Sequence, residues 1–208
     1  MPIVLCTSSQ QASMHARPTV SIFTIANIVT ALRILVAPVF FFLLVQNQWW
    51  SSLWALVVFV LAAASDFVDG IVARRFGEVS AIGIFLDPLA DKILVLSALF
   101  GFVWLEVVPL PMVIVVAIRD VVATVLRVWR LSEGESLSPS RVAKWKTFVQ
   151  MGFVSVVLLI LTLDRIETPV SSAARWVRDS GAITLAMGIV VVLTVATLPG
   201  YFRRLFHQ

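Results

Sequence analysis

The chain of 208 residues has little charge and almost no cysteine. Charged residues make up 13% of it, where a soluble domain carries about 25%, and hydrophobic residues make up 60%. Apolar runs of about twenty residues, the length that spans a bilayer, recur too often for a soluble helical core. The single cysteine, Cys6, excludes an internal disulfide and a cysteine-rich zinc site. We therefore predict an integral membrane protein.

The formal net charge is +4, which in a soluble chain would suggest a nucleic-acid partner. Here the basic residues cluster beside the hydrophobic segments, where they face lipid head groups. We therefore expect membrane lipids and phosphorylated substrates as partners, and no nucleic acid.

The hydropathy pattern predicts an all-α bundle of about six transmembrane helices with an active-site cavity that faces the cytoplasm. Residues 1–20 are polar and are expected to form a tail or interfacial helix, and residues 21–208 a single membrane domain. A polar loop over 164–179 is expected to contain a short interfacial helix. The expected segments cover about 22–45, 53–75, 81–107, 112–129, 148–163 and 181–198.

Six spans would place both termini on one side of the membrane. Most basic residues near helix ends fall on that side, which predicts that it is cytoplasmic. Only Arg165, Arg175 and Arg178 fall on the other side. The basic residues of the predicted cytoplasmic side are Arg74, Arg75, Arg130, Arg141, Lys144, Lys146, Arg203 and Arg204.

Four aspartates lie at helical spacing in two successive apolar segments, where unpaired acids are costly. A charged residue at the centre of a membrane helix costs about 2.5–3.5 kcal/mol on the insertion scale, so the acids require cations among them. Each helix presents one polar stripe, which is difficult to explain as two solvated faces. The first stripe is Asp66, Asp69, Gly70, Ala73 and Arg74, and the second is Gly83, Asp87 and Asp91.

Carboxylate oxygens from two helices suit Mg²⁺ or Mn²⁺, and two such ions about 3.5–4 Å apart can clamp a transferring phosphoryl group. Small residues on the same faces, Gly70, Ala73 and Gly83, leave room for a ligand to approach. Spacing alone does not separate the roles of the four acids.

At these residues the sequence resembles the CDP-alcohol phosphatidyltransferases, whose pattern D-x-x-D-G-x-x-A-R-x8-G-x-x-x-D-x-x-x-D it matches at every fixed position. The flanking residues look most like the phosphatidylglycerophosphate synthase branch. The resemblance implies a multi-pass enzyme of the bacterial inner membrane, commonly a homodimer, that transfers a phosphatidyl group from CDP-diacylglycerol to an alcohol and releases CMP.

The resemblance also implies residue roles. Asp66, Asp69 and Asp87 are expected to bind metal, and Asp91 to bind metal and act as the base. Further residues of the pattern, together with Asp66 and Asp69, are expected to contact CDP-diacylglycerol. These further residues are Gly70, Ala73, Arg74 and Gly83.

Asn27, Thr30 and Arg33 share a face near the start of the first segment. They could snorkel to the interface, but they resemble the N-x-x-T-x-x-R that opens many family members. We therefore expect them beside the nucleotide of CDP-diacylglycerol.

The acceptor must be inferred from basic residues outside the acid pattern. A phosphorylated acceptor brings a dianion towards four carboxylates and needs cations of its own. Arg119 could instead form a self-neutralising pair with Asp120, and the bases near residue 141 could be ordinary positive-inside flank. We predict an acceptor-phosphate site formed by Arg119, Arg127, Arg141, Lys144 and Lys146.

This surplus of bases favours glycerol 3-phosphate, giving phosphatidylglycerophosphate. Phosphatidylglycerol, as in a cardiolipin synthase, and inositol phosphate are the alternatives within the family. A divalent-cation transporter is the alternative of another class, because acids inside a membrane also line ion pathways.

Overall fold

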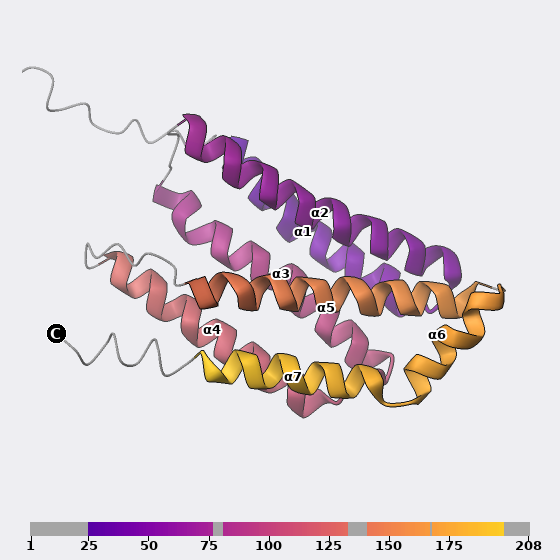
Figure 1. The fold of residues 1–208 in the computed structure, drawn as a ribbon. Coiled ribbons are helices and arrows are strands. Elements are labelled where there is room, and N and C mark those ends of the chain that lie inside the picture. The colour runs from indigo at the N-terminus through magenta and orange to yellow at the C-terminus, as the bar shows by residue number, and fades with distance from the viewer. Residues whose placement is uncertain (1–24, 77–80, 133–140, 167, 198–208) are drawn as a thin grey trace, which may run out of the picture.

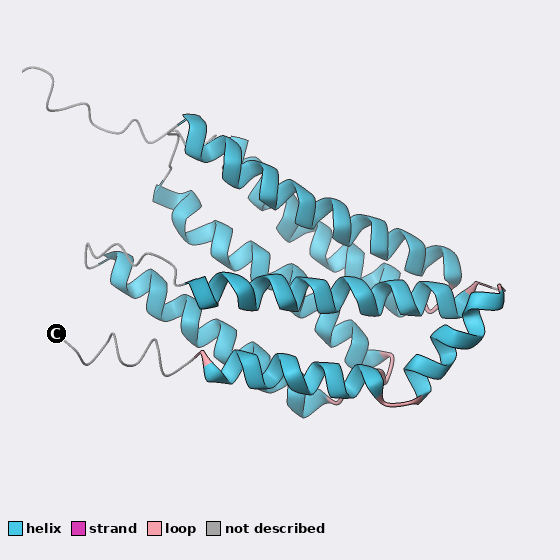
Figure 2. Ribbon diagram, in the orientation of Figure 1, coloured by secondary structure: helices cyan, strands magenta, loops and turns pink. Residues whose placement is uncertain are grey.

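The computed structural model describes residues 25–76, 81–132, 141–166 and 168–197, and their side chains over 31–65, 92–126, 145–166 and 168–197. Within this part all regular structure is helical (Figure 2), as predicted. The helices are α1 (Ile25–Val45), α2 (Trp49–Phe76), α3 (Ala81–Trp104), α4 (Leu110–Ser132), α5 (Arg141–Arg165), α6 (Pro169–Asp179) and α7 (Ala182–Ala196).

Six long helices pack side by side as a closed ring (Figure 1). The order around the ring is α2, α1, α3, α4, α7 and α5, with α5 returning to α2. The most extensive packing joins α1 to α3, so α1 lies between the two helices that carry the acid pattern. The short helix α6 joins α5 to α7 and packs on both at one end of the bundle.

The six predicted segments coincide with the six long helices, but several ends differ. The α2 helix begins at Trp49, earlier than the predicted residue 53. Hydroxyl groups cap its first turn: Ser51 Oγ accepts a hydrogen bond from the Gln48 N–H at 3.2 Å and donates one to the Gln48 carbonyl at 2.9 Å. This is half of a capping box, which satisfies groups that the first turn leaves unpaired.

The α3 helix ends at Trp104, before the predicted residue 107. Glu106 has a φ of 58°, the left-handed conformation that ends many helices. The N–H of Val107 bonds to the Phe102 carbonyl at 2.9 Å, and the N–H of Glu106 to that of Val103 at 3.0 Å. These two bonds form a Schellman motif, with glutamate where glycine is usual.

The apolar core lies along the ring's interior. Phe40 of α1 and Phe59 of α2 are fully buried, with ring centroids 5.8 Å apart. Gly101 allows α1 to approach α3, because an added Cβ would overlap the Leu44 side chain. The other large, fully buried apolar side chains are Leu44, Leu99, Phe102, Val113, Val116, Val154, Leu158, Leu161 and Met187.

The outward faces of the helices are also apolar. Leu35 of α1 is 69% exposed and Leu185 of α7 is 74% exposed, and similar residues continue along these faces. An apolar surface that surrounds the bundle would aggregate in water but suits contact with lipid tails. It supports the prediction of a membrane protein.

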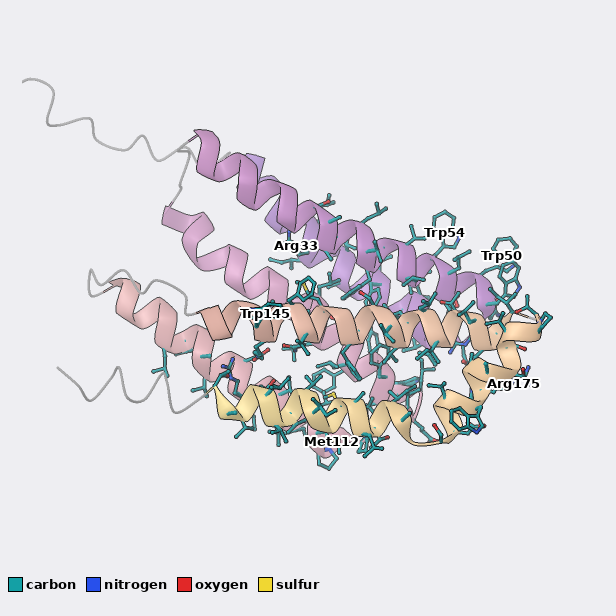
Figure 3. The ribbon with its side chains drawn as sticks, in the orientation of Figure 1. Arg33, Trp50, Trp54, Met112, Trp145 and Arg175 are labelled. Carbon is teal, nitrogen blue, oxygen red and sulfur yellow. The ribbon has the colours of Figure 1, made fainter. Side chains whose placement is uncertain are left out.

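Several tryptophans gather at the end of the bundle that carries α6. Trp50 and Trp54 project outward from the first turns of α2 (Figure 3), and Trp104 and Trp176 are each 71% exposed. Exposed tryptophan is typical of a membrane–water interface. This end therefore has the character of an interface.

By length and composition, one described helical stretch, Trp145–Arg165, could cross a membrane alone. The pair Pro169–Asp179 and Ala182–Ala196, bent by 54°, could provide a second span. Shorter apolar stretches occupy Ala31–Val45, Trp49–Ser65 and Lys92–Trp104. The six-span topology therefore stays a prediction.

Candidate active site

The structure places the acid pattern on the two predicted helices. Asp66 and Asp69 belong to about the last three turns of α2, and Asp87 and Asp91 to about the first three turns of α3. The last turns of α4 and the first turns of α5 lie at the same end of the bundle (Figure 1). Among the side chains that are described, no three of His, Cys, Asp and Glu gather as a metal site, and the four aspartate side chains lie outside that part.

The described side chains form a charged cluster around Asp120 of α4, which is only 1% exposed. Its Oδ1 accepts hydrogen bonds from Lys146 Nζ of α5 and, at 3.2 Å, from Arg119 NH1. Lys92 Nζ of α3 lies 3.4 Å from Oδ2, an ion-pair distance. No described group donates a hydrogen bond to Oδ2. One carboxylate thus binds cations from three helices.

Arg119 also ties this cluster to α7. Its Nε donates a hydrogen bond to the Thr194 carbonyl at 3.0 Å, and its NH2 group donates one to Thr197 Oγ1. Both acceptors belong to the last turn of α7 and its C-terminal cap. The guanidinium therefore satisfies a helix end whose carbonyls lack partners within the helix.

The charges in this cluster do not balance. Among the described side chains, Lys92, Arg119 and Lys146 carry three formal positive charges and Asp120 carries one negative charge, which leaves +2 without the four aspartates of the acid pattern, whose side chains lie outside that part. The three cations are largely buried, so water screens the excess charge poorly. This concentration of buried cations is the kind of arrangement that can bind an anion.

Two further polar residues are buried, one on α5 and one on α1. Gln150 lies one turn beyond Lys146 on α5 and is 1% exposed, and neither of its amide atoms has a hydrogen-bond partner in the described part of the chain. Arg33 of α1 is also buried. The sequence placed Arg33 beside the nucleotide and did not identify Gln150.

A second buried carboxylate lies at the opposite end of the bundle. Asp164, at the end of α5, pairs with Arg175 Nε at 3.3 Å and Arg178 NH1 at 2.5 Å, both from α6. Arg165 donates a hydrogen bond to the Asn47 side chain in the turn between α1 and α2. These contacts fasten α6 across the end of the bundle, which is a structural role.

Only part of the predicted acceptor site falls among the described side chains. The structure brings Arg119 and Lys146 together on Asp120, so Arg119 and Asp120 do not form an isolated, self-neutralising pair. The sequence interpretation missed Lys92 and the contacts of Asp120 with both lysines. Lys92 follows Asp91 directly in the sequence, and this position next to the acid pattern could have marked it as a candidate site residue.

The other predicted site residues lie on described helices, but their side chains do not belong to the described part. The basic residues of the predicted acceptor site in this group lie on α4 and α5. The remainder lie on α1, α2 and α3. Both groups together are Asn27, Thr30, Gly70, Ala73, Arg74, Gly83, Arg127, Arg141 and Lys144.

Comparison with known proteins defines the class of the molecule. Residues 23–198 match the CDP-alcohol phosphatidyltransferase family, and this match covers the whole described bundle. The chain belongs to this family and is an enzyme of the CDP-alcohol phosphatidyltransferase class. The transporter hypothesis is therefore set aside.

The relatives indicate the branch. The chain is 33% identical over 168 residues to the CDP-diacylglycerol–glycerol-3-phosphate 3-phosphatidyltransferase of Bacillus subtilis, covering 74% of this chain and 87% of that protein. It is 32% identical over 166 residues to the protein of the same name from Cereibacter sphaeroides, covering 78% and 75%. It is also 36% identical over 108 residues to the cardiolipin synthase (CMP-forming) of Streptomyces coelicolor, covering 50% of each chain.

Proposed function

We propose that this protein transfers the phosphatidyl group of CDP-diacylglycerol to glycerol 3-phosphate, forming phosphatidylglycerophosphate and CMP. The observation that carries the proposal is the similarity, over most of both chains, to relatives named for this reaction. The residues independently favour a phosphorylated acceptor, because the described side chains around Asp120 include three cations and one carboxylate.

The acid pattern fits a divalent-metal site by the chemistry of its donors. Four aspartates supply only oxygen ligands, which Mg²⁺ and Mn²⁺ prefer. Asp66, Asp69, Asp87 and Asp91 would hold two such ions. When bound, the ions would neutralise charge on the pyrophosphate of CDP-diacylglycerol.

The residues of the chain then divide the remaining tasks. Asp91 accepts the proton of the acceptor hydroxyl, while the oxygen of that hydroxyl forms a bond to the phosphorus that carries diacylglycerol. The phosphoanhydride bond breaks and CMP leaves with the electron pair of that bond. The CDP-diacylglycerol head group is bound by Asn27, Thr30, Arg33, Gly70, Ala73, Arg74 and Gly83.

The acceptor phosphate is bound by cations that α4 and α5 supply. Arg119 and Lys146 are already adjacent on Asp120. Charge-assisted hydrogen bonds from such groups hold a phosphate about twice as strongly as neutral ones. Arg127, Arg141 and Lys144, at the same end of the bundle, complete the proposed site.

The proposed topology follows from the same assignment. Six helices cross the bacterial inner membrane, with both termini and the acid pattern on the cytoplasmic side. CDP-diacylglycerol then enters from the surrounding lipid, while glycerol 3-phosphate and CMP exchange with the cytoplasm. We propose a homodimer as the assembled form, as is common in the family.

An acceptor screen tests the proposal. Purified protein with Mg²⁺ and labelled CDP-diacylglycerol is supplied separately with glycerol 3-phosphate, phosphatidylglycerol or inositol phosphate, and lipid product and CMP are measured. Glycerol 3-phosphate should give phosphatidylglycerophosphate and stoichiometric CMP. The acceptor assignment is wrong if only another alcohol supports CMP release. Phosphatidylglycerol is included because of the similarity to the Streptomyces coelicolor cardiolipin synthase.

A further inference from the structure

Asp120 takes no part in the proposed reaction, although it contacts three cations from three helices. If Asp120 served only to neutralise Arg119, it would not need to contact two lysines from other helices as well. Three cations on one carboxylate are more than its charge can balance. The arrangement therefore needs an explanation other than ion pairing.

The side chains differ in stiffness. An aspartate has a short side chain, and α4 fixes its Cα, whereas each lysine ammonium is carried on a flexible four-carbon stem. A carboxylate buried in the bundle can therefore determine where Lys92 Nζ and Lys146 Nζ lie. Without it, the buried ammonium groups would repel each other and turn towards water.

We propose that Asp120 is a positioning residue that holds Lys92, Arg119 and Lys146 as one preformed binding site for a phosphate dianion. The inference deepens the proposed function, on which it rests, by adding Lys92 to the acceptor-phosphate site. Lys92 also follows Asp91 on α3. The contact between Lys92 and Asp120 thus fixes the acceptor phosphate relative to the residue that accepts the hydroxyl proton.

Coulomb's law alone gives the opposite expectation. The negative charge of Asp120 repels a phosphate, so its removal would strengthen acceptor binding. The geometry favours positioning, because Lys146 is buried and has no other described anion beside it. The two effects change the KM for the acceptor in opposite directions, so one measurement separates them.

The experiment compares Asp120→Asn with Asp120→Glu and with a matched control in the full-length enzyme. Asp164→Asn is the control, because Asp164 is also a buried carboxylate with two cationic partners but lies at the opposite end. Asp120→Asn should raise the KM for glycerol 3-phosphate by about tenfold or more, within the coupling range of neighbouring charged residues. The KM for CDP-diacylglycerol should change by less than about twofold, as expected when only the acceptor's binding is weakened.

The control variants define the role further. Asp120→Glu should recover a large part of the acceptor affinity, because it restores the charge. Asp164→Asn should lower thermal stability and leave both KM values unchanged. Asp120→Asn combined with Lys146→Gln should raise the KM by less than the product of the single effects, because Asp120 acts through Lys146.

Other results would overturn the inference. An unchanged acceptor KM in Asp120→Asn with a lower Tm indicates a purely structural ion pair, and a lower KM indicates simple repulsion. If Asp120→Asn does not fold, Lys92→Gln takes its place, and an unchanged acceptor KM there removes Lys92 from the site.

Anion binding is also measured without catalysis, as the thermal stabilisation of the detergent-solubilised enzyme by inorganic phosphate. Stabilisation in the wild type and Asp164→Asn, but not in Asp120→Asn, supports the site even if glycerol 3-phosphate fails as acceptor. Equal stabilisation in all three contradicts it. Failure of the proposed reaction and failure of the positioning role therefore give different results.

Discussion

Replacing Lys146 with glutamine tests the acceptor site most directly. Lys146 Nζ contacts Asp120 Oδ1 in the interior, and its loss reduces the cluster's formal charge from +2 to +1, the sum of Lys92, Arg119 and Asp120. A hydrogen bond to a charged group contributes about 1.5–3 kcal/mol. At about 1.4 kcal/mol per tenfold change, the KM for glycerol 3-phosphate should rise about 10- to 150-fold.

The assay follows CMP release in mixed micelles, with glycerol 3-phosphate varied at saturating CDP-diacylglycerol and then the reverse. Arg178→Gln is the control, because Arg178 is also paired with a buried aspartate but at the opposite end. The reasoning fails if Lys146→Gln raises both KM values equally, or if Arg178→Gln reproduces its effect. Either result would show a general loss of structure.

Three further predictions test the base, the topology and the packing. Asp91→Asn should lower kcat by about 10²–10⁴-fold, the contribution of general base catalysis, with little change in Tm; near-normal turnover would exclude Asp91 as the base. Single cysteines at Ser136 and Ser172 should react with impermeant reagents from opposite sides of the membrane, and labelling from one side would contradict six spans. Gly101→Ala should lower the free energy of unfolding by about 1–3 kcal/mol, because the added Cβ would overlap the buried Leu44 side chain; an unchanged Tm in detergent would show that Leu44 can shift without cost.

The sequence predicted the six long helices because apolar runs and helical polar stripes are continuous signals. It placed several helix ends wrongly because hydropathy does not register local hydrogen bonds. Ser51 lies between two predicted segments, although its hydroxyl caps α2. Glu106 adopts a left-handed conformation that its residue type does not favour. The α5 helix begins at Arg141, earlier than the predicted residue 148, and within this added stretch Lys146 has a partner inside the bundle.

The candidate site could be predicted only as far as each helix face. Periodicity grouped the four aspartates, and charge led to the prediction that Arg119 and Lys146 are acceptor ligands, which stays a prediction. That both converge on Asp120 with Lys92 depends on how α3, α4 and α5 pack, and one sequence contains no information about that packing.

The two buried aspartates show why the cluster around Asp120 is the better candidate for a binding site. At Asp164, the paired side chains of Arg175 and Arg178 are 58% and 41% exposed, so water screens their charges. At Asp120, the side chains of Lys92, Arg119 and Lys146 are only 19%, 6% and 4% exposed. Burying a charge without a counterion costs several kcal/mol, and the described part of the chain supplies one carboxylate for these three cations. A phosphate dianion would balance the charges of these described side chains, which is why we propose this cluster, and not the one at Asp164, as the acceptor-phosphate site.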